Sequence, residues 1–297
     1  MPAELMKGHV WAERKDAVDR KGNPIVTYPV YAEVKHDEIR CHVIVDAYSV
    51  QFLSYSGKRL ANMQEFAHLF VGLSKDTGFN EFDCGFEVNG NFNDSYRWVR
   101  STKALPTDLK DKPCTIQFYL FDLPECATEF HARNLTRYAV VDAAGTWLSV
   151  PTGEVCPTEA CVDAAYERAR AAGKEGLMIK QFNHRYQCGK RTDGWLKMKP
   201  ENDADGIITA LHEAVCGKDQ PDLGLMAGDP LGRTGSVTIR MPDGSEASPH
   251  GIQHDLGVEM HLNPQAYVGQ WAEFNYMERD RQGGYRHPTW GRLREAK

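Results

Sequence analysis

The segment from Pro29 to Val45 restricts the fold of this chain more than any other part of the sequence. It reads PVYAEVKHDEIRCHVIV, so polar and apolar residues alternate around β-branched side chains. Such alternation is typical of strands that bury one face, and the charged residues near Asp37 and Glu38 mark a turn. We therefore predict two strands separated by this turn, with Lys35 at the end of the first strand.

Further elements are predicted on both sides of this segment. Runs rich in apolar residues predict strands at 81–88, 115–123 and 176–180, and helical spacing predicts helices at 60–73 and 159–172. After Pro200 the chain changes to short strand-like runs separated by Gly, Pro, Asn and Asp. That texture is typical of a small β module such as an oligonucleotide-binding (OB) barrel. We expect an α+β fold.

Composition limits the class of protein. A chain of 297 residues with 41% hydrophobic residues can bury one large core or two modest ones, so we expect two domains at most. The sequence holds no apolar run near the roughly 18 residues that a membrane helix needs, and its start lacks the apolar core of a secretory signal. We expect a cytoplasmic protein without a membrane partner. Its eight cysteines form no C-x-x-C pair, so reduced, mostly buried thiols are expected rather than a zinc knuckle.

The charge distribution leaves nucleic acid open as a partner. A net charge of −6 argues against a protein that coats nucleic acid indiscriminately, but it permits a local basic track. Such a track runs from position 180 to 199 and contains one acid, Asp193. Its basic residues are Lys180, Arg185, Lys190, Arg191, Lys197 and Lys199. Taken alone, the track fits a solvated face as well as a nucleic-acid surface.

The chemistry depends on an ordered set of short motifs. They are Glu33–Arg40 (EVKHDEIR), Phe86–Val88 (FEV), Phe121–Asp122 (FD), Glu175–Lys180 (EGLMIK) and Trp195–Lys199 (WLKMK). A lone lysine is ordinarily a surface residue, so the meaning of Lys35 comes from the motifs that follow it. Their intervals suit strands of one mixed sheet. Carboxylates on separate strands can hold a hard divalent cation, and lysines at i and i+2 share one side of a strand. The set outlines a triphosphate site.

This order of motifs resembles that of the covalent nucleotidyltransferases, which comprise DNA ligases, RNA ligases and messenger-RNA capping enzymes. Their signature is KxDGxR, a glutamate strand, a phenylalanine strand, EGhhhK and KhK. The chain is similar above all to the small ATP-dependent ligases of short-tailed bacteriophages. Asp193–Leu211 looks like their lysine strand running into a hinge, and Tyr285–Trp290 looks like their closing segment. The resemblance extends from about Glu33 to Lys297.

The resemblance implies a fold and an activity. It implies a nucleotidyltransferase domain at 1–202, with mixed and antiparallel sheets and flanking helices, followed by an all-β OB domain at 203–297. The implied activity is the sealing of nicks in double-stranded DNA by a monomer, with ATP as substrate and Mg²⁺, or alternatively Mn²⁺, as the metal. Lys35 would take AMP from ATP, pass it to the 5′-phosphate of the nick, and AMP would leave when the 3′-hydroxyl attacks.

The resemblance also implies residue roles. Lys35 would be the nucleophile, with its pKa lowered by neighbouring cations and a metal. Phe121 would stack on the base opposite Met178 or Ile179. The ATP-binding residues implied are Glu33, Val34, Lys35, Arg40, Glu87, Phe121, Met178, Ile179, Lys197, Lys199, Arg294 and Lys297. Glu87 and Glu175 would bind the metal or position groups around it. Lys58, Lys180, Arg185, Lys190 and Arg191 would contact DNA. His36 and His42 are interpreted as structural.

Three positions depart from the family pattern. Glu38 stands where the family has glycine, Tyr55 where many relatives have arginine, and Ala296 where the last motif has aspartate. In the family pattern, all three positions belong to motifs that bind or orient phosphate groups. Two alternatives therefore stay open: an RNA ligase or RNA guanylyltransferase with the same lysine chemistry, and a nick-binding protein with impaired catalysis.

Overall fold

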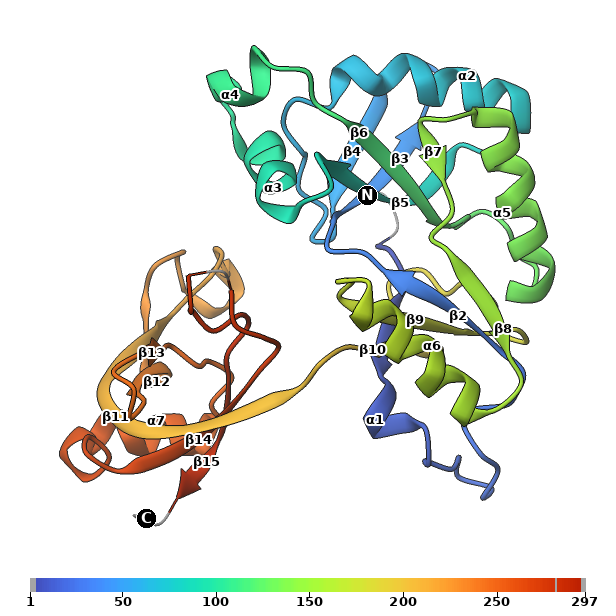
Figure 1. Ribbon diagram of the computed structural model, residues 1–297. Coiled ribbons are helices and arrows are strands. Elements are labelled where there is room, and N and C mark those ends of the chain that lie inside the picture. Colours follow the sequence, from blue (N-terminus) through green and yellow to red (C-terminus); the bar gives the residue numbers. More distant parts are fainter. Residues whose placement is uncertain (1–3, 281, 295–297) are drawn as a thin grey trace. The chain divides into compact units, whose positions relative to one another are not determined.

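The computed structural model describes residues 4–280 and 282–294, which form two compact units divided between Met198 and Lys199 (Figure 1). The first unit holds two five-stranded sheets and the second holds one. This mixture of helices and mainly antiparallel strands confirms the predicted α+β class. Each unit is described separately below.

The first sheet of the first unit lies on the largest apolar core. Its strands, in spatial order, are β4 (Val50–Ser54), β3 (Ile39–Val45), β5 (Glu81–Val88), β6 (Ile116–Asp122) and β7 (Leu148–Ser149). All neighbours pair antiparallel except β6 and β7. The accompanying helices are η1 (Gln64–Phe66), α2 (Ala67–Thr77), α3 (Phe92–Arg100), α4 (Thr107–Lys110) and α5 (Phe130–Ala144). Phenylalanines from η1, α2, β5 and β6 pack together in this core.

The second sheet of the first unit carries the expected nucleophile. Its order is β1 (Lys7–Val10), β10 (Arg191–Met198), β9 (Gly176–Gln181), β2 (Val30–Lys35) and β8 (Gly153–Cys156). Only β1 and β10 pair in parallel. Its helices are α1 (Trp11–Arg14) and α6 (Glu159–Ala171). The side chain of Thr158 caps α6 by accepting a hydrogen bond from the Cys161 amide.

The second unit is built around one antiparallel sheet. Its order is β13 (Glu246–Ala247), β12 (Pro230–Arg240), β11 (Asn202–Val215), β14 (Trp271–Tyr276) and β15 (Thr289–Arg294). The sheet encloses a core with α7 (His254–Leu262), in which Ile208, Ile239 and Phe274 are fully buried. Two short 3₁₀ turns, η2 (Pro221–Leu223) and η3 (Pro264–Ala266), complete it. The β-rich module predicted after Pro200 is therefore present, and it also contains the helix α7.

The sequence motifs lie on two sheets, so the expectation of one mixed sheet is wrong. The strands β2, β9 and β10 belong to one sheet, whereas β3, β5 and β6 belong to the other. The turn at 36–38 carries the chain from β2 to β3. β2 pairs antiparallel with β9 in one sheet, and β3 pairs antiparallel with β5 in the other. The turn and Lys35 therefore lie where the two sheets meet.

One helix prediction needs correction, and α5 is a helix that the sequence analysis missed. The helix predicted at 60–73 begins later and ends later, as η1 and then α2. Helix α5 was not predicted, because its buried positions include the polar residues Arg133, Asn134 and Arg137 as well as Phe130 and Val140. A search for apolar periodicity does not detect such a face. No described helix is long and apolar enough to cross a membrane.

The aromatic core gives a stability prediction. Phe118 on β6 is 1% exposed, and its ring centre lies 5.1 Å from that of Phe86 and 5.2 Å from that of Phe70. Phe118→Ala is expected to lower the free energy of unfolding by about 3–5 kcal/mol through lost burial and a new cavity. Urea unfolding followed by tryptophan fluorescence measures this. Tyr48→Ala, at a side chain 98% exposed, is the control; an equal loss in both variants would contradict this account of the core.

Candidate active site

A pocket of about 260 Å³ lies between the two sheets of the first unit. Residues of both sheets line it, together with residues of the turn between β2 and β3. The lining residues are Lys7, Gly8, Glu33, Val34, Lys35, His36, Glu38, Arg40, Tyr55, Phe121, Met178, Trp195 and Lys197. Seven of the residues expected at an ATP site therefore share one cavity, namely Glu33, Val34, Lys35, Arg40, Phe121, Met178 and Lys197.

Lys35 ends β2 and forms an ion pair with Glu175, the residue just before β9. The register of the two strands produces this pair, because Lys35 lies opposite Gly176. Burial lowers the pKa of Lys35, but the carboxylates of Glu38, Glu175 and Asp37 together outweigh burial and raise it. The protein's own groups therefore do not lower the pKa of Lys35, contrary to the expectation that neighbouring cations would. They hold Lys35 in its protonated form.

Glu38 follows Asp37 in the turn between β2 and β3, and β5 makes room for its side chain. A Cβ atom on Gly85 would clash with Glu38 Cγ and would lie 2.5 Å from Phe121 Cζ. The glycine on β5 thus lets two larger side chains approach the sheet. Glu38 Oε2 is buried without a hydrogen-bond partner, and burial raises the pKa of this carboxyl to about 8. Glu38 is therefore a poorly solvated acid beside Lys35.

Arg40 is held in a fixed orientation before any ligand binds. Its Nε and Nη2 atoms donate to the two carboxylate oxygens of Asp83 at 2.9 and 2.6 Å, and Nη2 also donates to the Met6 carbonyl at 2.7 Å. Tyr186 donates its hydroxyl to Asp83 at 2.8 Å. Such a two-pronged pair restricts the guanidinium strongly. If Arg40 binds ribose or phosphate as expected, it must do so with the part of its side chain that lines the pocket.

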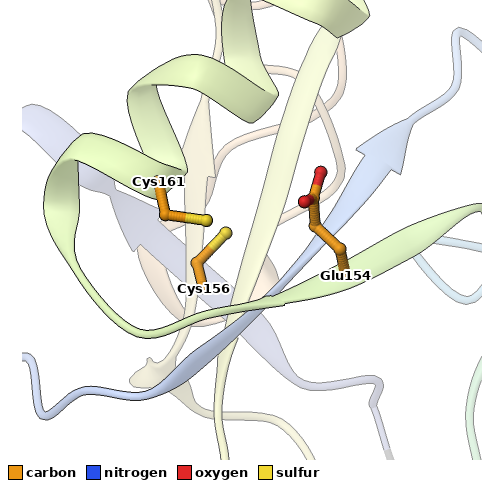
Figure 2. A group of neighbouring side chains, drawn as sticks. All are labelled: Glu154, Cys156 and Cys161. Carbon is orange, nitrogen blue, oxygen red and sulfur yellow. The ribbon is translucent and has the colours of Figure 1, made fainter.

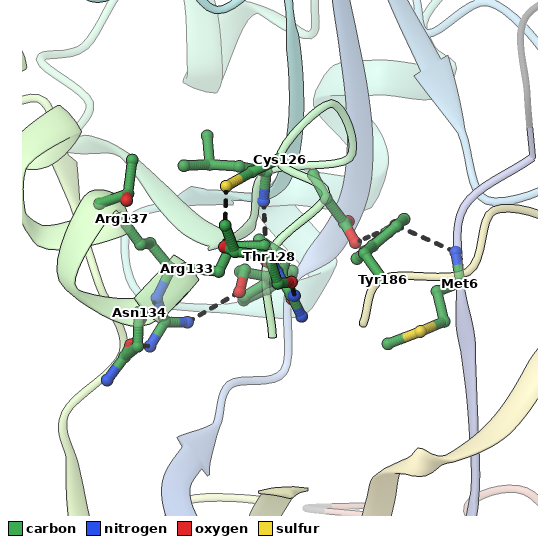
Figure 3. A network of polar contacts seen from close by, with 12 residues as sticks. Met6, Cys126, Thr128, Arg133, Asn134, Arg137 and Tyr186 are labelled. Carbon is green, nitrogen blue, oxygen red and sulfur yellow. Dashed lines mark hydrogen bonds and ion pairs between the residues drawn. The ribbon is translucent and has the colours of Figure 1, made fainter. Parts of the chain in front are cut away.

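Glu33 is buried between two cations. Arg137 Nη1 on α5 donates to Glu33 Oε2 at 2.8 Å, and Lys180 Nζ on β9 donates to Glu33 Oε1 at 2.5 Å. Figure 3 shows Arg133, Asn134 and Arg137 along α5. No sequence motif indicated Arg137, because α5 itself was not predicted. Lys180 is 0% exposed, so its expected DNA contact is corrected: this lysine pairs with Glu33 inside the protein.

Of the three residues expected to enclose the base, two line the pocket and one does not. Phe121 and Met178 line the pocket. Ile179 is fully buried and packs in the core beneath α6, because successive residues of a strand point to opposite faces. Of the two residues that the sequence left open, Met178 lines the pocket, whereas the burial of Ile179 in the core corrects its predicted place in the site.

Glu87 lies outside the pocket lining. Its carboxylate accepts a hydrogen bond from the Tyr119 hydroxyl at 3.0 Å, and the Tyr119 ring centre lies 3.9 Å from that of His36. Burial lowers the pKa of His36 to about 4, so this pocket-lining imidazole is neutral near pH 7. His42 is buried, and its Nε2 atom lies 3.4 Å from Glu81 Oε2.

Five further predicted residues lie at the surface. Lys58, Arg185, Lys190, Arg191 and Lys199 are all exposed. In the second unit, Arg294 pairs with Asp205 and Glu273. Lys297 and Ala296 lie outside the described residues. Lys7 and Tyr55 are additions to the site: Lys7 Nζ lies 4.9 Å from the Tyr55 ring centre, and no motif in the sequence indicated Lys7.

A second group of potential metal ligands lies on β8 and α6. Glu154, Cys156 and Cys161 lie close together, with their potential ligand atoms within 4.8 Å of one another (Figure 2). Burial and a hydrogen bond with Cys161 raise the pKa of the Cys156 thiol to about 12. Glu154 also pairs with Arg168 at 2.5 Å. Because Mg²⁺ prefers oxygen ligands, this sulfur-containing group does not match the metal expected with a triphosphate.

Glu38 gives a prediction about pH. Its pKa is raised from 4.5 to about 8 in the folded protein, so the neutral carboxyl stabilises the fold below about pH 4.5, and this contribution is lost as pH rises through 8. Wild type should therefore lose stability relative to Glu38→Gln between about pH 5 and 8. Urea unfolding across this range measures the difference. Glu65→Gln removes an exposed carboxylate as the control, and a pH-independent difference for Glu38→Gln would refute the assignment.

Comparison with known proteins relates this geometry to a family. Residues 98–199 match the family described as "ATP dependent DNA ligase domain". The DNA ligase of Enterobacteria phage T3 is 31% identical over 153 residues, which cover 50% of this chain and only 41% of the phage protein. The matched part is therefore less than half of that relative.

Solved structures extend the likeness in fold over nearly the whole chain. A Lig E DNA ligase has a TM-score of 0.66 at 18% identity, covering 99% of this chain and all of that protein (100%). The ATP complex of the bacteriophage T7 ligase has a TM-score of 0.53 at 21% identity, with 98% of each chain covered. The predicted combination of a nucleotidyltransferase domain and an OB domain is the fold of these proteins. With its motifs gathered around one pocket, the chain carries an ATP-dependent DNA ligase domain over residues 98–199 and is related to the DNA ligases of phages T3 and T7.

Proposed function

We propose that this chain is an ATP-dependent DNA ligase that seals nicks in duplex DNA through a Lys35-AMP intermediate. The observation that carries the proposal is the pocket, where Lys35, two further cations (Arg40 and Lys197) and the ring of Phe121 line one cavity. An amine beside cationic and aromatic groups suits attack on a nucleoside triphosphate. The partner is a nicked DNA duplex, and the protein acts as a monomer.

The reaction consists of three successive nucleophilic displacements at phosphorus. Lys35 Nζ attacks the α-phosphorus of ATP, an N–P bond forms, and pyrophosphate leaves. The AMP then passes to the 5′-phosphate of the nick, which restores the lysine. The 3′-hydroxyl finally attacks that 5′-phosphate, the phosphodiester forms, and AMP leaves. The first transfer requires Lys35 without its proton, although the carboxylates around it raise its pKa in the protein alone.

Charge neutralisation around Lys35 follows from this requirement. Cations placed against the carboxylates of Glu38 and Glu175 would relieve their hold on the Lys35 proton. The oxygen-only donor set and the unpartnered Glu38 Oε2 fit a hard divalent ion such as Mg²⁺. Such an ion supplies neutralisation of triphosphate charge. Of the two residues expected to hold it, Glu175 is the better placed, since it contacts Lys35, whereas Glu87 lies beyond Tyr119.

The other site residues divide the substrate between them. Phe121 and Met178 hold the base, with Glu33 at its edge, and Val34 adds to the wall. Arg40 and Lys197 face ribose and phosphates. We retain Lys199, Arg294 and Lys297 as candidates for orienting pyrophosphate, a role that requires Arg294 to exchange its acidic partners for the nucleotide.

Lys35→Ala is expected to abolish covalent labelling of the protein by ATP, because no other side chain can replace the nucleophile. Incubation with α-labelled ATP and Mg²⁺, followed by denaturing electrophoresis, measures the AMP-protein band. Lys75→Ala, at an exposed lysine of α2, is the matched control and should label normally. Substantial labelling of Lys35→Ala would overturn the assignment.

The same assay distinguishes the alternatives. Labelling by GTP rather than ATP would favour an RNA guanylyltransferase, and sealing of nicked RNA rather than DNA would favour an RNA ligase. Binding of nicked DNA without any AMP-protein band would support a nick-binding protein with impaired catalysis. This is the hypothesis that the departure at Glu38 raised.

The exposed basic residues give a DNA-binding prediction. Lys58, Arg185, Lys190 and Arg191 remain the proposed DNA contacts, and all four are exposed. Arg185→Glu combined with Lys190→Glu should weaken binding to nicked DNA and reduce the slope of log K against log salt by about 0.9 for each phosphate that the protein no longer neutralises. Fluorescence anisotropy at several salt concentrations measures both. An unchanged slope, or an equal effect of the control Lys75→Glu, would place the DNA elsewhere.

A further inference from the structure

Two arginines one turn apart on α5 make buried ion pairs with different targets. Arg133 is 1% exposed, and its Nε and Nη2 atoms donate to Asp122 at 2.5 and 3.1 Å. Arg137 is 0% exposed and pairs with Glu33. Of the two carboxylates, Glu33 is among the residues that line the pocket, whereas Asp122 is not. The two pairs are alike in chemistry and burial but differ in their access to the site.

Arg137 is itself fixed by its own helix. Its Nε and Nη2 atoms donate to Asn134 Oδ1 at 3.1 and 2.7 Å, which leaves Nη1 for the pocket side. Nη1 donates to Glu33 Oε2 at 2.8 Å and to the Phe121 carbonyl at 2.7 Å. One guanidinium therefore connects a side chain and a backbone group that both belong to pocket-lining residues.

Lys180 completes the support of Glu33 from the other side. Its Nζ atom donates to Glu33 Oε1 at 2.5 Å and to the same Phe121 carbonyl at 2.6 Å. Each oxygen of Glu33 thus accepts a hydrogen bond from one cationic donor. A carboxylate oxygen has further lone pairs, so each can still accept a hydrogen bond from the pocket. It cannot donate one.

We propose that Arg137 is a positioning residue that holds Glu33 as a fixed acceptor for the C6 amino group of the nucleobase, and so selects ATP over ITP. The inference rests on the proposed function and adds a residue that does not touch the nucleotide. Adenine presents an amino group at C6, whereas hypoxanthine presents a carbonyl oxygen there. An immobile carboxylate accepts from the first and repels the second, and a carboxylate free to rotate would discriminate less.

The test compares nucleotides in one assay. Initial rates of covalent labelling with ATP and with ITP give kcat/KM for each, and their ratio measures base selection. Wild type should favour ATP by about a hundredfold or more, as expected when a buried polar group loses its partner. Arg137→Lys keeps the charge but loses the fork that spans Asn134, Glu33 and Phe121. It should reduce the ATP-to-ITP ratio by about tenfold or more.

The matched control is Arg133→Lys, which weakens an equally buried pair on the same helix. It should leave the ATP-to-ITP ratio within about twofold of wild type, even if both rates fall. Arg137→Met provides a second variant, and circular dichroism with thermal unfolding establishes that each variant is folded. A merely structural role of Arg137 would lower both rates together and leave the ratio unchanged.

The outcomes separate the inference from the proposed function. If wild type forms no nucleotidyl-protein from ATP, the proposed function fails. If wild type labels with ATP but uses ITP equally well, or if folded Arg137→Lys keeps the wild-type ratio, the positioning role is refuted while the ligase assignment stands. An equal fall in the ratio for Arg133→Lys would also refute it, because the effect would then belong to the helix and not to the Glu33 contact.

Discussion

The burial of Glu33 between Arg137 and Lys180 is the interaction on which the site depends. A carboxylate without exposed surface is costly unless cations and hydrogen bonds compensate for lost water. Here the compensation comes from three elements, since Glu33 lies on β2, Lys180 on β9 and Arg137 on α5. Both cations also bind the Phe121 carbonyl on β6. One charge cluster therefore joins the two sheets of the first unit at the wall of the pocket.

The electrostatics of Lys35 follow from the same junction of sheets. The chain leaves one sheet after Lys35 and enters the other at Ile39, so the acidic turn residues lie beside the amine. With Glu175 opposite, these carboxylates keep the lysine protonated in the protein alone. Neutralising these carboxylates therefore requires a bound cation, because a triphosphate itself brings further negative charge. Gly85 makes this arrangement sterically feasible, because only a residue without Cβ leaves room for Glu38 and Phe121 together.

The predictions from sequence succeeded where the backbone pattern was local. Alternation around Lys35 located β2 and β3, and short apolar runs located β5, β6 and β9. They failed where burial and polarity disagree. The inward face of α5 carries two arginines and an asparagine, and Lys180 belongs to a basic run although its side chain is fully buried. Periodicity assumes that charged residues face water, and an ion pair between distant segments breaks that assumption.

The sequence by itself determined the α+β class, the change to β structure after Pro200, and the order of motifs that identifies Lys35 as the candidate nucleophile. It also indicated most of the pocket lining. Only the tertiary structure decided that the motifs lie on two sheets, that Met178 and not Ile179 faces the pocket, and that Arg137 supports Glu33. The physical reason is separation along the chain. Glu33 and Arg137 are 104 residues apart, so their pairing arises only when the sheets and α5 pack and exclude water from both charges.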